Sequence, residues 1–200
     1  RDLLREQPVE TASARPRERG IAMIDAPVSG GSEGAVKATL TIFVGGDATD
    51  VERGRPVLAA MGKTITHVGP IGAGQAVKAV NQVILAGAYL GVAEGIALAI
   101  KAGLDVEQVV GALGGGAAQS WVLENRSGRM IDNDYPLGFK VALHRKDLGI
   151  ALDLANQLGA VLPVSALAAQ LESGLIAGGH GDDDMSALAR SIRGLSGLED

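Results

Sequence analysis

The sequence predicts an α/β segment followed by an all-helical domain, and two observations carry that prediction. Before residue 70, three short runs have the composition of β-strands: 21–29, 39–46 and 65–69. After Gly72, no stretch alternates as a strand does, and apolar residues recur at helical spacing instead. The boundary therefore falls near residue 70, giving parts 1–70 and 71–200.

The first part is expected to have the order strand, strand, helix, strand. The short helix lies between the second and third runs, with Asp50 as a plausible N-cap and Gly62 as its stop signal. Residues 1–19 have little apolar periodicity and contain prolines, so a poorly ordered lead-in is expected there. This arrangement is typical of the closing part of an α/β domain.

The second part is expected to consist of helices separated by turn-like segments rich in glycine, proline and aspartate. Asp105 and Asp184 are the expected N-caps of two of these helices. The predicted helices cover about 75–102, 105–113, 118–131, 139–159, 163–177 and 184–195.

Composition excludes several classes of protein. Of the 200 residues, 46% are hydrophobic and 20% are charged, which is typical of a globular chain. The formal charge of −5 and the lack of a basic cluster argue against a nucleic-acid partner. The absence of cysteine excludes disulfides and thiolate metal sites, and it fits a cytoplasmic location.

The stretch 82–100, "QVILAGAYLGVAEGIALAI", is almost long and apolar enough to cross a membrane. Glu94 lies inside it, and an acidic residue at a membrane centre costs about 2.5–3.5 kcal/mol. The stretch also continues a polar segment, "GQAVKAVNQ". The sequence therefore predicts one long helix buried in a protein core, and no membrane is expected as a partner.

The segment Gly69–Gln82, "GPIGAGQAVKAVNQ", looks like a dinucleotide-binding loop but does not match its pattern. The fingerprint G-x-G-x-x-G/A needs a small third residue, and Val77 stands at that position. The "GKT" at 62–64 is not a P-loop, because Val57 stands where that motif needs glycine.

What remains in this segment is a pair of polar residues, Lys78 and Asn81, on one face of a helix. A lysine near a helix N-terminus is close to the positive end of the dipole, which favours the neutral amine. Such a lysine suits general acid–base work, although spacing alone fits an ordinary polar helix face better.

Two further segments are candidates. Ser29, Gly30 and Gly31 follow a predicted strand and offer a hydroxyl and open backbone amides to an anion, although an ordinary turn explains them too. Lys146 and Asp147 lie on a predicted amphipathic helix; as neighbours they are expected to point in different directions.

The remaining polar candidates suggest no metal site. His67 and His144 lack metal-ligand spacing to any partner. The run 180–184, "HGDDD", is interpreted as a solvated loop in which Asp184 caps the last helix. Trp121 is expected to lie in the core.

Taken in order, "DAPVSGG", "GxGxxxKxxNQ" about forty residues later and "F(x)3L(x)2KDL" after about sixty more resemble the β-hydroxyacid dehydrogenase family. That family includes 3-hydroxyisobutyrate dehydrogenase and 2-hydroxy-3-oxopropionate reductase. The resemblance covers roughly residues 20–195. It implies the last strands of a Rossmann domain, a long interdomain helix and an all-α domain that builds a homodimer or homotetramer.

The resemblance also implies roles for the candidate residues. Lys78 matches the catalytic lysine, which exchanges a proton with the substrate oxygen. Ser29, Gly30 and Gly31 match the loop that holds the substrate carboxylate, and Asn81 matches a residue that hydrogen-bonds the substrate.

Lys146 matches a lysine near the nicotinamide of NAD or NADP, and Asp147 helps to place it. Gln82 departs from the Asn-Asn pair of hydroxyisobutyrate-type members and is similar to the oxopropionate reductase branch. The implied substrate is a small hydroxy or oxo acid.

One departure from the family pattern is larger. Neither a G-x-G-x-x-G loop nor an acidic ribose-binding residue occurs in these 200 residues. The resulting hypothesis is an N-terminally truncated member that binds NAD(P) poorly by itself. An inactive homologue acting as a helical dimerisation module, or an imine-reductase-like relative, is the alternative; the presence of Lys78 and Asn81 argues against the latter.

Overall fold

A computed structural model describes residues 18–198, which form two compact units. The first unit extends to Asn81 and also takes in Gln157–Gly159. The second comprises Gln82–Asn156 and the residues from Ala160 onward. Of the lead-in expected at 1–19, residues 1–17 lie outside the described part of the chain.

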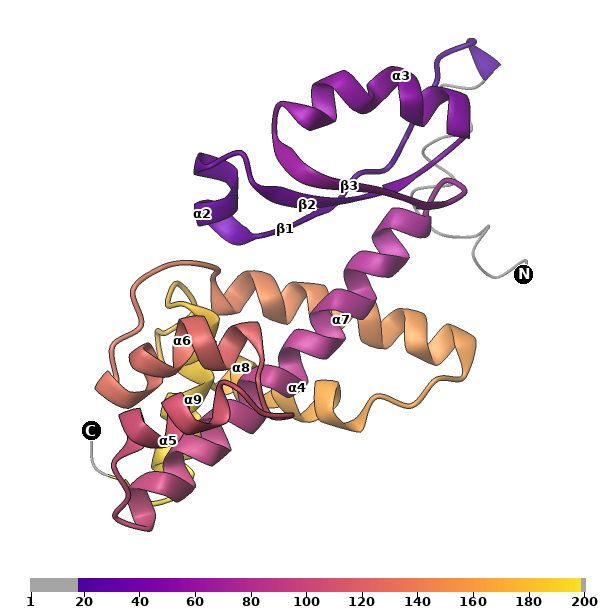
Figure 1. Ribbon diagram of the computed structural model, residues 1–200. Helices are drawn as coiled ribbons and strands as arrows, with labels where there is room; N and C mark the ends of the chain where they lie inside the picture. Colours follow the sequence, from indigo (N-terminus) through magenta and orange to yellow (C-terminus); the bar gives the residue numbers. More distant parts are fainter. Residues whose placement is uncertain (1–17, 199–200) are drawn as a thin grey trace. The chain divides into compact units, whose positions relative to one another are not determined.

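The first unit is built on a three-stranded sheet in the order β1-β2-β3 (Figure 1). Strand β1, Val28–Ser29, is antiparallel to β2, Leu40–Gly45, and β2 is parallel to β3, Gly62–Gly69. Helix α3, Ala48–Ala59, connects the two parallel strands and packs against them. The three predicted strands and the helix between the second and third of them are confirmed. The small core between helix and sheet contains Leu40, Ile42, Val44, Val51 and Leu58.

Three local details of this unit differ from the prediction. The first strand is short, because beyond β1 only an isolated bridge between Asp25 and Gly45 continues the pairing. A short helix, α2, spans Gly31–Val36, and its sequence "GSEGAV" gives no helical signal because glycine disfavours helices. The N-cap of α3 is Asp47, whose carboxylate accepts from the Thr49 amide at 2.9 Å, so the predicted Asp50 cap is wrong.

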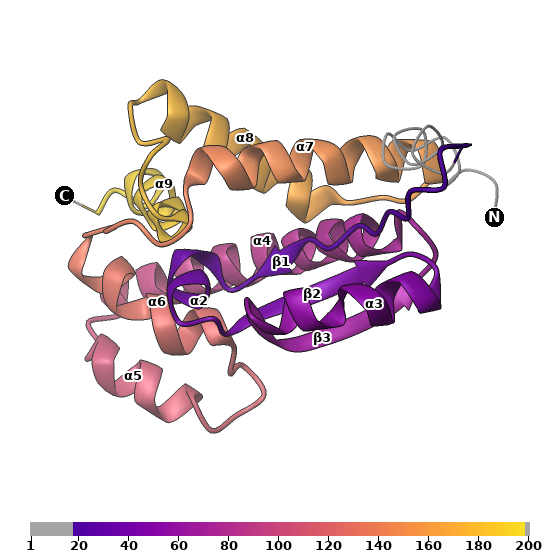
Figure 2. The ribbon, with the colours of Figure 1, turned by 90° about the horizontal axis from the view of Figure 1, so that it is seen from above.

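The described part of the second unit contains helices and no strand, as predicted (Figure 2). The carboxylates of Asp105 and Asp184 cap their helices, which confirms both predicted N-caps. The last predicted helix begins as a 3₁₀ turn, η2. The elements are α4 Ala73–Lys101, α5 Val106–Leu113, α6 Trp121–Asp132, α7 Val141–Leu158, α8 Pro163–Ala177, η2 Met185–Ala187 and α9 Leu188–Leu195.

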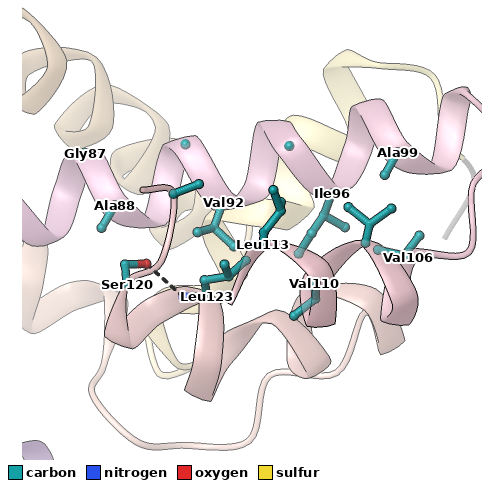
Figure 3. Close-up of a pocket in the computed structure, with 14 residues that line it drawn as sticks. Gly87, Ala88, Val92, Ile96, Ala99, Val106, Val110, Leu113, Ser120 and Leu123 are labelled. Atoms are coloured by element: carbon teal, nitrogen blue, oxygen red, sulfur yellow. Dashed lines mark hydrogen bonds between the residues drawn. The ribbon is translucent and has the colours of Figure 1, made fainter. Parts of the chain in front are cut away.

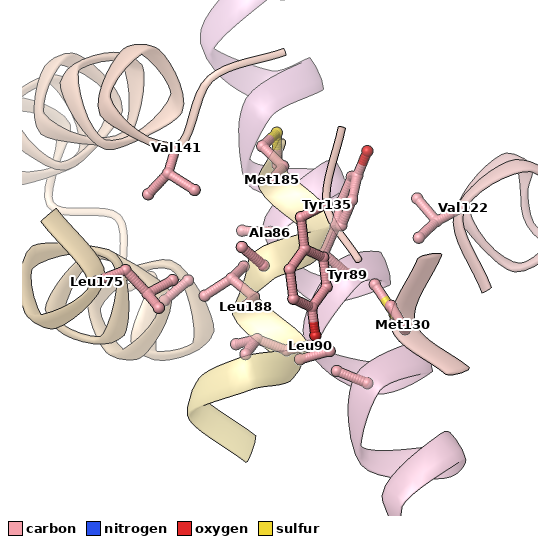
Figure 4. Packing of buried hydrophobic residues seen from close by; sticks show 14 of the residues in the cluster. Ala86, Tyr89, Leu90, Val122, Met130, Tyr135, Val141, Leu175, Met185 and Leu188 are labelled. Carbon is pink, nitrogen blue, oxygen red and sulfur yellow. The ribbon is translucent and has the colours of Figure 1, made fainter. Parts of the chain in front are cut away.

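Helix α4 supplies the centre of the second unit's core (Figure 4). By length and composition alone this helix could cross a membrane, but one of its faces is buried against the other helices. Glu94 lies on the exposed side of the helix. The predicted core helix is therefore confirmed for the face that carries Ala86, Tyr89, Leu90, Ala93 and Ile96.

Asp184 lies buried in this unit, so the interpretation of 180–184 as a solvated loop is wrong at this residue. Its carboxylate accepts from the Phe139 amide at 2.9 Å and the Ser186 hydroxyl at 2.7 Å, and it pairs with Arg129 at 3.2 Å. The pKa of Tyr89 is raised, mainly because burial disfavours its phenolate and to a lesser extent because the Asp184 charge repels it. These contacts connect the start of η2 to the loop that precedes α7.

Trp121 is half exposed, at 50%, and therefore does not lie in the core as expected. It is the first residue of α6, and the guanidinium of Arg126 lies 4.6 Å from its ring centre. A cation over an indole face explains a tryptophan on the surface without a pocket.

Candidate active site

Asp25 connects the segment "DAPVSGG" to the start of α4. One carboxylate oxygen accepts from the Gly72 amide at 2.6 Å and the other from the Gln75 amide at 2.8 Å. Amides at the beginning of a helix have no partner within the helix, and an anion there is favourable. With only 5% of its surface exposed, Asp25 ties the first sequence motif to the second.

Two glycines make room for this carboxylate. A Cβ atom on Gly45 would lie 2.3 Å from one Asp25 oxygen, and a Cβ on Gly74 would lie 2.5 Å from the other. The same Cβ on Gly74 would lie 2.6 Å from the main-chain oxygen of Phe43. Gly74 is therefore required by the packing of α4 on Asp25 and β2.

Lys78 and Asn81 lie in α4, within the first unit, and both are half-buried. The helix begins at Ala73, so Lys78 belongs to its second turn, whereas the dipole acts mainly on the first. Asp25 also places a negative charge at this helix end. The expected effect of the helix dipole on the Lys78 amine is therefore not supported by the geometry.

Ser29, Gly30 and Gly31 form the turn between β1 and α2. Ser29 ends β1, opposite Thr41 of β2. Gly30 has φ 128° and Gly31 has φ 61°, values that residues with a side chain rarely adopt. Both glycines are consequently required by the backbone of this turn, whether or not it binds a ligand.

Lys146 and Asp147 lie in α7, within the second unit. The Lys146 ammonium lies 2.8 Å from one Asp147 oxygen, so the expectation that these neighbours point in different directions is wrong. The long lysine side chain can curve back along the helix surface, which spacing by residue number does not reveal. The other Asp147 oxygen accepts from the side-chain amide of Gln82 at 2.8 Å.

The predicted residues are thus divided between the two units. The turn at Ser29–Gly31 and the helix with Lys78 share the first unit, and Lys146 and Asp147 share the second. Sequence reasoning gave Asp25 no role and treated Gln82 only as a marker of the family branch. An acidic residue inside an otherwise apolar β-run, upstream of a glycine-rich helix start, is the signal that could have identified Asp25 as a cap.

A pocket of about 330 Å³ lies in the second unit, between α4, α5 and α6 (Figure 3). Its lining is almost entirely apolar, and none of the predicted site residues contributes to it. Ser120, its polar lining residue, uses its hydroxyl to accept from the Leu123 amide at 3.0 Å and so caps α6. Among residues 18–198, no three histidine, aspartate or glutamate side chains are grouped as a metal site would require.

Two family models match the chain. Residues 72–192, more than half of the chain, match the model described as NAD-binding of NADP-dependent 3-hydroxyisobutyrate dehydrogenase. The chain belongs to this family. Residues 6–69 match the model described as NAD binding domain of 6-phosphogluconate dehydrogenase. This second match identifies the three-stranded sheet as part of a Rossmann domain. The resemblance inferred from the three motifs is confirmed.

Individual family members agree with this assignment. The chain is 42% identical to 2-hydroxy-3-oxopropionate reductase of Escherichia coli, over 96% of this chain and 66% of that protein. It is 40% identical to NAD-dependent L-serine dehydrogenase of Pseudomonas aeruginosa, over 88% of this chain and 62% of that protein.

A solved structure of Mycobacterium tuberculosis 3-hydroxyisobutyrate dehydrogenase with L-serine superposes with a TM-score of 0.85 at 36% identity. The match covers 92% of this chain and 66% of that one. The chain spans about 60% of the length of the curated relatives it matches.

Replacing Asp25 with alanine should destabilise the first unit by about 3 kcal/mol. The change removes two charge-assisted hydrogen bonds and leaves two helix amides without an acceptor. The matched control is Asp47→Ala, which removes an exposed cap and should cost about 1 kcal/mol. Urea denaturation followed by circular dichroism measures both; equal costs would contradict a special role for Asp25.

Proposed function

We propose that this chain is the substrate-side and helical part of an NAD(P)-dependent oxidoreductase that interconverts a small 3-hydroxy acid and its 3-oxo acid. The observation that carries the proposal is the Asp25 contact. It holds "DAPVSGG" and the helix with Lys78 and Asn81 in one unit, through bonds of 2.6 and 2.8 Å. Those two segments carry the substrate-binding and proton-transfer residues that the family pattern implies.

The substrate carboxylate is assigned to the turn at Ser29–Gly31. Gly30 and Gly31 have no side chains to cover their main-chain amides, so these amides and the Ser29 hydroxyl are the groups that we assign to the anion. Asn81 is assigned to the substrate hydroxyl or carboxylate, since its amide can both donate and accept. Relatives named for L-serine and for 2-hydroxy-3-oxopropionate support a short substrate with one carboxylate.

Lys78 is assigned as the general acid and base. In the reducing direction its ammonium donates a proton to the substrate carbonyl oxygen as that carbon receives hydride, which yields the hydroxy acid and a neutral amine. In the oxidising direction the neutral amine takes the hydroxyl proton. The nicotinamide, when bound, supplies or accepts the hydride.

Lys146 and Asp147 are assigned to the nicotinamide side of the cofactor. The Lys146 side chain is 63% exposed, so it can reach a ligand while it remains paired with Asp147. These two residues suit the nicotinamide end of NAD or NADP, but no glycine-rich loop for the pyrophosphate occurs in the sequence.

The helical unit is assigned a second role in joining copies of the chain into a homodimer or homotetramer. The apolar pocket beside α4 supports this proposal, as do the exposed side chains of Ile84, at 66%, and Leu98, at 71%. Apolar surface that a single chain leaves open is commonly covered by another copy.

Lys78→Ala should lower turnover of the full-length gene product by about 10²- to 10⁴-fold, as expected for loss of a general acid. The matched control is Lys63→Ala, which removes an exposed lysine from β3 and should leave turnover unchanged. Oxidation of NADH or NADPH with small 3-oxo acids is followed by absorbance. A loss within about threefold would remove Lys78 from the mechanism.

The 200-residue chain alone should bind NADH and NADPH weakly, because a pyrophosphate without a helix-terminal glycine loop loses its main anchor. Cofactor fluorescence titrated with the chain measures the affinity. Micromolar binding would show that the residues present are sufficient to hold the cofactor, and the expectation of weak binding would then be wrong.

Gly91→Leu should shift the chain from a dimer or larger oligomer towards a monomer in sedimentation velocity. A Cβ on Gly91 meets no atom within 4 Å, so leucine fits the single chain but fills the pocket that a second copy would enter. Gly128→Leu is the matched control, since its Cβ also meets no atom and lies outside the pocket. A monomeric wild type, or equal effects of the two changes, would contradict this interface.

A further inference from the structure

Gln82 is a completely buried amide on α4, with 0% of its surface exposed. A buried amide is costly unless it is hydrogen-bonded, so its partners indicate what it does. Its side-chain nitrogen donates to Asp147 at 2.8 Å, and its main-chain oxygen lies 3.2 Å from Nε2 of His144. Both partners belong to α7.

His144 and Asp147 are three residues apart on α7 and therefore share one face of that helix. The other ring nitrogen of His144 lies 2.5 Å from a carboxylate oxygen of Glu172 in α8, and both side chains are fully buried. The imidazole is thus fixed from both sides. It holds the Gln82 main chain against the same face of α7 that presents Asp147.

The two oxygens of Asp147 have different partners. One accepts from the buried Gln82 amide, and the other pairs with the Lys146 ammonium at 2.8 Å. The Asp147 side chain is 15% exposed and that of Lys146 is 63% exposed. The carboxylate therefore connects a rigid buried donor to a cation that faces solvent.

We propose that Gln82 is a positioning residue for Lys146 and acts on it through Asp147. The inference rests on the proposed function in taking Lys146 as the residue beside the nicotinamide. Without the Gln82 bond, the Asp147 carboxylate is free to rotate about its side-chain torsions, and an exposed lysine that pairs with it loses its fixed partner.

The length of the Gln82 side chain is essential to this arrangement. Asparagine has the same amide but is one methylene shorter, about 1.5 Å. From the same helix position its nitrogen would lie too far from Asp147 for a hydrogen bond. Gln82→Asn therefore keeps a side-chain amide at this position but makes it too short to bond Asp147, whereas Gln82→Leu removes the hydrogen-bond donor altogether.

The test measures how fast Lys146 reacts with an acylating reagent, by peptide mass spectrometry of the 200-residue chain. Lys140 is the internal reference, because it also lies near the start of α7 and pairs with Asp182 at 2.7 Å. Gln82→Leu, Gln82→Asn and Asp147→Asn should each increase the acylation rate of Lys146 about two- to fivefold. This is the change in rate that corresponds to the loss of an exposed ion pair. The rate at Lys140 should not change.

The double variant Gln82→Leu/Asp147→Asn distinguishes positioning from general loosening. If Gln82 acts through Asp147, the double variant labels Lys146 no faster than Asp147→Asn alone. A further increase there, a matching increase at Lys140, or an unchanged Lys146 rate in the Gln82 variants would overturn the proposal. If Gln82→Leu does not fold, Gln82→Asn provides the same comparison.

Labelling does not depend on turnover, so this inference and the proposed function can fail separately. If the Gln82 variants leave the acylation rate of Lys146 unchanged while reductase activity is present, only the role of Gln82 is rejected and the proposed function stands. An intact Lys146 effect with no reductase activity in the full-length gene product would reject the proposed function and leave the Gln82 contact as a structural one.

Discussion

The contact between Asp25 and the first amides of α4 is the interaction on which the first unit depends. A buried carboxylate needs hydrogen-bond donors, and a helix N-terminus needs acceptors, so each compensates the other's cost of burial. The exposed fraction of Asp25, 5%, leaves little room for water to replace these donors. The β-segment and α4 meet at this point, and the proposed substrate turn and proton donor are placed by the two elements that meet there.

The second unit relies on a different kind of contact, a succession of buried polar groups between helices. Glu172 of α8 contacts His144 of α7, and His144 contacts the main chain of Gln82 on α4. Such groups are expensive to bury singly but specify one arrangement when each has its partner. They orient helices whose apolar surfaces, rich in alanine and leucine, would otherwise pack in several similar ways.

Sequence patterns predicted the helices well because hydrophobic periodicity and caps are local signals. Asp105 illustrates this, since its cap lies within a few residues of the helix it begins. The patterns failed where the deciding contact is distant in sequence. Asp25 meets Gln75 fifty residues away, and Gln82 meets Asp147 sixty-five residues away, so no window along the chain contains either pair. Trp121 was misplaced for another reason, because its partner is a cation and not the core.

The closeness of Gly45 and Gly74 to Asp25 also constrains how this protein can change. A methyl group on either glycine would occupy the place of a carboxylate oxygen, and a shorter residue at 25 would leave amides unpaired. A single substitution at any of the three positions should therefore destabilise the protein, whereas a joint replacement of all three could leave its stability unchanged. Members of the family should consequently inherit these three residues as a set, and their variation should be correlated even where the substrate differs.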